Sequence, residues 1–118
     1  MKDKIKMDFT CVNKNFKSGI LRILIIKKLE NKKIHTYALM KEIQSNKKIS
    51  LNVTKNDIYN VILAMEKLGL IKYTLNKKNK TQKVLELTPR GKSLSKKFKF
   101  IVKNYLKSLN ELMVEMNE

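Results

Sequence analysis

The sequence predicts a mainly α, winged helix-turn-helix fold with an α+β architecture, in which three helices precede a two-stranded wing and one long helix follows it. Apolar residues recur at helical spacing over most of the 118 residues, and a single polar hairpin pattern interrupts them. The composition contains only 3 Gly and 1 Pro. Few helix-breaking residues favour long regular elements over loops.

The first two helices are expected between residue 16 and the middle of the chain. From about Phe16, the run FKSGILRILIIKKLE is apolar around most of its helical wheel, which is typical of a buried helix. In HTYALMKEIQ, Thr36 is a candidate N-cap for a short second helix whose apolar side would include Tyr37 and Ile43. Residues 1–15 show no steady period, so we expect an arm or a short leading helix there.

The third helix has the clearest start signal in the chain, in TKNDIYNVILAMEKLGL. Thr54 and Asp57, three positions apart, have the spacing of a capping box. Gly69 supplies a stop at the C-terminal end. One apolar face is expected, comprising Ile58, Val61, Ile62, Met65 and Leu68. The opposite side would then remain available for binding.

A hairpin and a long helix are expected to complete the fold. IKYTLN and TQKVLELT alternate apolar and polar residues around the polar turn KKNK, which predicts a two-stranded hairpin with a basic tip. Thr88 and Pro89 have the N-cap and first-position pattern of a final helix. The expected domains are therefore an arm or leading helix at 1–15, a winged helix-turn-helix domain at 16–88, and a dimerisation helix at 89–118.

The final helix carries an apolar stripe at steps of three and four residues that begins at Leu94. It is too long to bury this stripe against so small a domain, so we expect a partner's equivalent helix or first helix to cover it. The alternative is a helix folded back on its own domain. The residues expected at the dimer interface are Phe98, Ile101, Tyr105, Leu109, Leu112 and Met116.

The charge indicates a polyanionic partner. Lys and Arg number 27 against 10 Asp and Glu, a formal net charge of +17. AT-rich coding DNA by itself enriches a protein in Lys, Ile and Asn, so some of the lysines could be ordinary solvated surface residues. That bias does not explain the shortage of acidic residues. No apolar run is long enough to span a bilayer, and the first residues lack the apolar core of a signal peptide. We therefore expect a cytoplasmic protein that binds nucleic acid and no membrane.

Catalysis and metal binding are not expected. Cys11 and His35 are the only cysteine and histidine, so one chain cannot supply a zinc site from them. Cys11 lies in a polar segment without an activating motif. The sequence therefore predicts a protein that is not an enzyme and that uses no metal and no cofactor.

The predicted fold assigns separate tasks to the third helix and the wing. A helix fits the major groove of double-stranded DNA, while wing lysines contact phosphates. The candidate base-contacting residues are Lys55, Asn56, Tyr59 and Asn60. The candidate phosphate-contacting residues are Thr54, Lys77, Lys78 and Lys80. The alternatives are a helix-start residue for Asn56, a packing residue for Tyr59, and a merely soluble turn for the three lysines.

Three fragments resemble the signature regions of the PadR-like transcriptional regulators: HTYALMKEI, TKNDIYNVILAMEKLGLI and KVLELTPRGKSL. Two positions depart from that pattern, because Thr36 stands where glycine is usual and Leu85 where a wing tyrosine is common. The resemblance implies a homodimeric, usually repressive transcription factor whose C-terminal helices pair with the partner subunit. The matching residues are His35, Tyr37, Tyr59, Glu66, Gly69, Leu70, Leu87, Thr88 and Gly91.

Two functions remain open from the sequence. The first is a homodimeric, sequence-specific transcriptional regulator of the repressor type. The alternative is an architectural or plasmid or viral DNA-segregation protein that coats DNA repeats, and the charge of +17 on so short a chain favours it. An RNA-binding role is weaker, because the chain lacks an exposed aromatic platform for single strands. No sequence feature marks a small-molecule effector.

Overall fold

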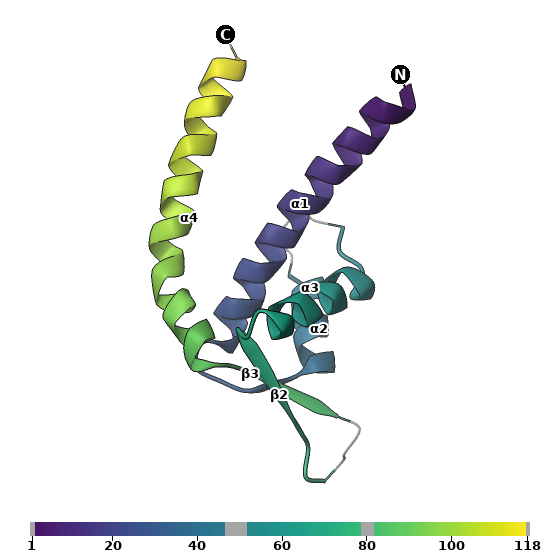
Figure 1. The fold of residues 1–118 in the computed structure, drawn as a ribbon, viewed down its shortest axis with the longest axis vertical. Coiled ribbons are helices and arrows are strands. Elements are labelled where there is room, and N and C mark those ends of the chain that lie inside the picture. Colours follow the sequence, from purple (N-terminus) through teal and green to yellow (C-terminus); the bar gives the residue numbers. More distant parts are fainter. Residues whose placement is uncertain (1, 47–51, 79–81, 118) are drawn as a thin grey trace.

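The computed structural model describes residues 2–46, 52–78 and 82–117, with side chains from residue 12 onward. Helices α1 and α4 rise side by side from one end of the molecule, and the wing projects from the other (Figure 1). The predicted fold class is confirmed. The sequence also suggests Leu51 as an apolar anchor of the turn before the third helix, and this residue lies outside the described residues. The elements are α1 (Lys2–Leu29), β1 (Ile34–His35), α2 (Thr36–Gln44), α3 (Lys55–Lys67), β2 (Ile71–Leu75), β3 (Lys83–Leu87) and α4 (Pro89–Met116).

Helix α1 is longer than the sequence indicates. The predicted start near Phe16 was wrong, because the helix runs without a break from Lys2 to Leu29. Val12 and Phe16 are more than half exposed. Because they do not pack into the core of this chain, a regular spacing of apolar residues is not needed in this part of the helix. Extending an existing helix adds one hydrogen bond for each residue fixed and needs no new nucleus, so the helix continues without such a pattern.

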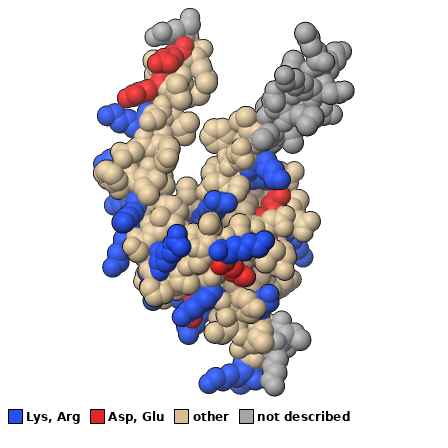
Figure 2. Space-filling model, viewed as in Figure 1, with Lys and Arg blue, Asp and Glu red and all other residues tan. Residues whose placement is uncertain are grey.

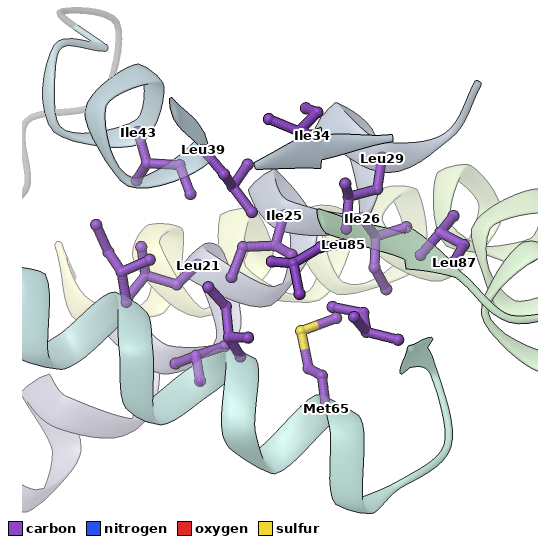
Figure 3. Close-up of a cluster of buried hydrophobic side chains, with 14 residues drawn as sticks. Leu21, Ile25, Ile26, Leu29, Ile34, Leu39, Ile43, Met65, Leu85 and Leu87 are labelled. Atoms are coloured by element: carbon purple, nitrogen blue, oxygen red, sulfur yellow. The ribbon is translucent and has the colours of Figure 1, made fainter. Parts of the chain in front are cut away.

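The core lies where α1 is covered by the other elements. In Figure 3, the α1 side chains Leu21, Ile25 and Ile26 lie between Leu39 of α2 and Met65 of α3. The described part of the chain contributes no polar or charged side chain to the buried set. The buried residues are Leu21, Ile25, Ile26, Leu29, Ile34, Leu39, Ile43, Ile58, Val61, Ile62, Met65, Ile71, Leu85 and Leu87. Leu68, predicted on the α3 apolar face, is instead 47% exposed at the end of that helix.

The sheet has three antiparallel strands in the order β1-β3-β2. The expected hairpin of β2 and β3 is present, with Ile71 opposite Leu87 at its base and Leu75 opposite Lys83 towards the tip. Strand β1 lies where the sequence, with Ile34 following three polar residues, indicates only a short connection between the first two helices. Its two residues are too few to show alternation, and they form a strand because Ile34 pairs with Leu85 on the free edge of β3.

The ends of α3 follow the predicted signals. The Thr54 hydroxyl accepts the Asp57 N–H at 3.1 Å, and the Asp57 carboxylate accepts the Thr54 N–H at 2.9 Å. Gly69 has a φ of 74°, a left-handed conformation that favours glycine. The N–H of Leu70 donates to the Met65 carbonyl and that of Gly69 to the Glu66 carbonyl, which closes the helix in a Schellman motif.

The start of α2 differs from the prediction. His35, not Thr36, occupies the N-cap position, and it makes no side-chain cap. Pairing of β1 with β3 fixes His35 in extended backbone, which moves the helix start to Thr36. The Thr36 hydroxyl donates instead to the Lys83 carbonyl at 3.2 Å and so joins α2 to the wing.

One junction joins the end of α3, the base of the wing and the start of α4. The Thr88 hydroxyl accepts the Gly91 N–H at 3.0 Å and donates to the Gly69 carbonyl at 2.5 Å. The Thr88 N–H donates to the Leu70 carbonyl at 3.0 Å. A Cβ on Gly91 would collide with the same Leu70 carbonyl, so only glycine fits. Thr88 is therefore the predicted N-cap of α4 and also the link to the preceding turn.

Candidate nucleic-acid interface

Helix α3 presents a polar side to solvent. Its buried side packs Ile58 and Ile62 into the core. The residues predicted to contact bases, Lys55, Asn56, Tyr59 and Asn60, are all exposed on the helix. Lys55 and Asn56 occupy the first turn, beside the capping residue Thr54. The structure therefore presents all four side chains outside the core.

These four side chains do not form one cluster. Asn60 lines a small cavity of about 120 Å³ together with Lys14 and Lys17 of α1. Lys55 lies on the other side of the helix, near Tyr37 of α2. The solvent-facing side of α3 is thus flanked by α1 at Asn60 and by α2 at Lys55.

The prediction for Tyr37 was wrong. It was predicted on the apolar side of α2, but it is 61% exposed, while Leu39 and Ile43 are buried. The Nζ atoms of Lys41 and Lys55 lie 5.2 Å and 5.8 Å from the centroid of its ring. These distances are within the range of cation–π attraction. The Tyr37 to Lys41 spacing of four residues, which places both on one side of a helix, was the signal that could have revealed this group.

The wing extends the basic surface. Lys77 and Lys78 are exposed after the end of β2, and Lys80 lies outside the described residues. Asn76 organises the described part of this turn. Its N–H donates to the Gln82 carbonyl at 2.9 Å, and its side-chain oxygen accepts the Lys78 N–H at 3.0 Å.

An ion pair connects α1 to the start of α3. The Lys17 Nζ lies 3.0 Å from the Asp57 carboxylate. The pKa of Asp57 is lowered from its ordinary value of 3.8, first because the Thr54 backbone N–H donates to the carboxylate and then because Lys17 does. Asp57 therefore stays ionised at neutral pH and holds both the cap and the α1 contact.

Asp57, Glu42 and Glu86 pair with lysines of the same chain, whereas several other cations form no ion pair within the described ranges. Glu42 pairs with Lys28 at 3.6 Å, and Glu86 lies within 4 Å of both Lys33 and Lys72. Within the described ranges, Lys55, Lys77 and Lys78 form no ion pair with an acid. Figure 2 shows Lys and Arg atoms over much of the visible face and few acidic ones. Such a surface attracts a polyanion.

An apolar groove separates α1 from α4. It encloses about 940 Å³ and is visible as the tan hollow between the two helices in Figure 2. Its lining includes Phe16 and Ile20 of α1 and four of the predicted dimer residues, Phe98, Ile101, Tyr105 and Leu109. The other two predicted dimer residues lie farther along α4, where Leu112 is 48% and Met116 is 75% exposed.

The protein family of this chain follows from a match to a family model. Residues 25–97, which include β1, α2, α3 and the wing, match the model described as the transcriptional regulator PadR-like family. The chain belongs to this family. Members of the PadR family are DNA-binding transcriptional regulators that act on double-stranded DNA, and they are not enzymes. This PadR-like protein is therefore a DNA-binding regulator.

Solved structures agree with the assigned fold. A PadR family regulator from Clostridium difficile superposes with a TM-score of 0.65 at 24% identity, covering 79% of this chain and 97% of that one. A PadR-like regulator from Bacillus cereus gives 0.64 at 23% identity, covering 80% and 92%. A PadR family regulator from Eggerthella lenta gives 0.64 at 17% identity, covering 95% of each chain. A comparison with curated proteins gives no match.

Over residues 2–46, 52–78 and 82–117, no helix has both the length and the apolar character needed to cross a membrane. The same residues bring no three His, Cys, Asp or Glu side chains together in a way that could hold a metal ion.

Proposed function

We propose that this PadR-like regulator is a homodimer that binds a specific double-stranded DNA operator and represses transcription from it. The observation that carries this proposal is the capped helix α3, whose exposed polar residues are flanked by α1 at Asn60 and by Tyr37 and Lys41 of α2 at Lys55. We place the protein in the cytoplasm, associated with the nucleoid.

In this proposal, the N-terminal half of α3 enters the major groove. Asn56 is suited to the N6 and N7 edge of adenine, and Lys55 to the acceptors of guanine. Tyr59 and Asn60 lie about one turn farther along the helix, Tyr59 following Lys55 and Asn60 following Asn56. Thr54, Lys77, Lys78 and Lys80 would contact phosphates, with Tyr37 and Lys41 added from α2.

The groove between α1 and α4 supports the homodimer. Tyr105 is 68% and Leu109 is 42% exposed on a helix of 28 residues that packs against α1 and β3. An exposed apolar surface of this extent is typical of an association site. A second copy has the same stripe on its own α1 and α4, so a two-fold arrangement would cover both grooves. The division into a leading helical segment at 1–15, a DNA-binding domain at 16–88 and a dimerisation helix at 89–118 is part of this proposal, with the first boundary falling inside α1.

Selection of bound fragments from random DNA at two salt concentrations tests the proposal. We expect enrichment of a palindromic or pseudopalindromic site and a binding constant that falls with salt according to the number of phosphate contacts. Asn60→Ala is expected to relax base choice, whereas Lys78→Ala weakens binding to all sequences alike. Lack of any preferred site, together with equal losses for both variants, would contradict sequence-specific regulation.

The charge of +17 favours one alternative, an architectural or segregation protein that coats DNA repeats. That function predicts cooperative binding that grows with duplex length and shows no preferred site. The same selection experiment separates the two functions, because only a regulator enriches one sequence.

A further inference from the structure

We propose that the outer face of α4 is a second DNA-binding surface, which holds a duplex different from the one contacted by α3 and the wing. The proposal rests on the proposed function in one respect, since it takes the first duplex to be bound by α3 and the wing. Five lysines form the surface, and we call them the lysine ridge. They are Lys92, Lys96, Lys99, Lys103 and Lys107.

The lysine ridge is a single straight row. Successive members are separated by four, three, four and four residues. At the rotation of an α-helix, of about 100° per residue, all five fall within an arc of about 80°. From Lys92 to Lys107 the row extends about 22 Å along the helix axis. All five side chains are exposed.

The ridge points away from the groove. On the same helical wheel, the whole apolar stripe from Leu94 to Met116 is centred about 160° from the ridge. In Figure 2, basic side chains follow the outer edge of α4, on the side opposite α1. Pairing through the groove therefore leaves the ridge in solvent. Burying it would desolvate ammonium groups that have no ion-pair partner, which is strongly unfavourable.

The ridge lies in a stretch of α4 whose sequence contains no acidic residue. Between Pro89 and Asn110 the sequence contains no Asp or Glu, and the first acid of α4 is Glu111. Within the described ranges, no ridge lysine forms an ion pair with an acid. Like charges three and four residues apart in a helix repel one another. A polyanion along the row would relieve this repulsion.

Duplex DNA matches the ridge in charge density and form. A duplex carries about one negative charge per 1.7 Å of its axis, so a segment as long as the ridge offers many more phosphates than there are lysines. Each lysine that neutralises a phosphate also releases a condensed counterion. A membrane surface fits less well, because a helix that lies on a membrane buries its apolar face, and the apolar face of α4 is turned towards α1.

The ridge and the α3 surface lie on different sides of the molecule. Helix α1 packs against both α3 and α4 and lies between α4 and the N-terminal end of α3 (Figure 1). A straight duplex held by α3 and the wing therefore does not run along the outer face of α4. Occupation of both surfaces would connect two duplexes through one protein.

A capture assay tests the inference. One duplex is immobilised on beads, the protein is bound to it, and retention of a second, labelled duplex is measured. The ridge variant combines Lys96→Gln, Lys99→Gln and Lys103→Gln. The control combines Lys27→Gln, Lys32→Gln and Lys97→Gln, which removes the same charge from exposed positions outside the ridge.

We expect the wild type and the control to retain the second duplex equally. The ridge variant should retain about tenfold less, since three phosphate contacts are lost. Affinity for a single short duplex in dilute solution should be equal for the ridge variant and the control. Circular dichroism and the mass in solution should match for all three proteins, because glutamine is tolerated on an exposed helix surface.

Several results would overturn the inference. Undiminished capture by the ridge variant would show that the α3 surfaces of a dimer connect the two duplexes. If the wild type bound the first duplex normally but retained no second one, DNA binding by the lysine ridge would be refuted and the proposed function would stand. Lack of binding to any duplex would refute both. Loss of binding to phosphatidylglycerol vesicles in the ridge variant, with normal capture of DNA, would assign the ridge to lipid instead.

Discussion

The ammonium group of Lys17 lies 3.0 Å from the carboxylate of Asp57, and the same carboxylate accepts the backbone N–H of Thr54. One acidic side chain thus closes the capping box of the helix proposed to enter DNA and attaches that helix to α1. Since α1 also lines the apolar groove, the helix proposed for DNA recognition and the groove proposed for dimerisation share one structural support.

Replacing Asp57 with Ala is expected to destabilise the fold by about 1 kcal/mol, because the helix loses half of its capping box and its contact with α1. Lys17→Met removes only a partly exposed ion pair and should cost less than about 1 kcal/mol. Denaturant unfolding of both variants at one protein concentration provides the measurement. An equal loss for the two variants would mean that the ion pair, not the cap, supplies the stability.

The same carboxyl group predicts a pH dependence. Its pKa is lowered in the folded protein, so its contribution to stability is complete above the unfolded value of about 4 and is lost as the pH falls through the folded value. The stability difference between wild type and Asp57→Asn should therefore be constant near neutral pH and shrink below about pH 4. Unfolding curves at a series of pH values test this. A difference that persists unchanged to low pH would exclude the carboxylate as its source.

Gly91→Ala is expected to destabilise the protein by about 1 to 3 kcal/mol, because the new Cβ would collide with the backbone carbonyl of Leu70. The carbonyl cannot withdraw easily, since it also accepts the Thr88 N–H. Ser93→Ala, an exposed change two residues farther along α4, serves as the control and should lie within about 0.5 kcal/mol of wild type. Thermal or denaturant unfolding measures both. Equal stability of the two variants would show that the junction adjusts.

Tyr37→Phe tests the exposed ring between Lys41 and Lys55. If the hydroxyl donates to a phosphate, its loss should weaken binding to specific and random DNA alike by about 0.5 to 1.5 kcal/mol. Tyr105→Phe, which removes a hydroxyl from the groove side of α4, should leave DNA binding unchanged. Fluorescence anisotropy with both kinds of duplex measures the effect. A loss confined to the specific sequence would instead assign Tyr37 to a base.

Leu109→Lys places a charge in the apolar stripe of α4. Burial of a leucine contributes about 1.5 to 3 kcal/mol, so the dimer dissociation constant should rise at least about tenfold. Lys99→Gln, on the outer face of the same helix, is the control and should leave it unchanged. Light scattering over a range of concentrations gives the mass. A monomeric wild type at all concentrations would refute the proposed dimer.

The predictable features are those whose causes are local. Thr54 and Asp57 interact within one turn, and Gly69 adopts the conformation that its missing Cβ favours. Thr88 and Pro89 likewise mark a helix start through their own backbone preferences. The major helix boundaries from α3 onward, and the hairpin between them, could therefore be predicted from the sequence.

The features that were missed depend on residues far away in the chain. Strand β1 exists because Ile34 meets Leu85, 51 positions later. The exposure of Tyr37 depends on which side of the nine-residue helix α2 packs against α1. The spacing of apolar residues alone assigns Tyr37 to the buried side. The position of Asn60 beside α1 follows from how two helices pack, which sequence spacing does not report.

The junction at Thr88 also has a mechanical consequence. Helix α4 is 28 residues long, or about 42 Å, and it leaves the domain at the point where Thr88 holds the backbone of Gly69 and Leu70. The helix therefore forms a lever with its pivot at the base of the wing. A tilt of about 5° at the pivot moves the far end by about 4 Å. Binding of a partner at the distal end of α4 would therefore be coupled, through the length of this helix, to the orientation of the wing.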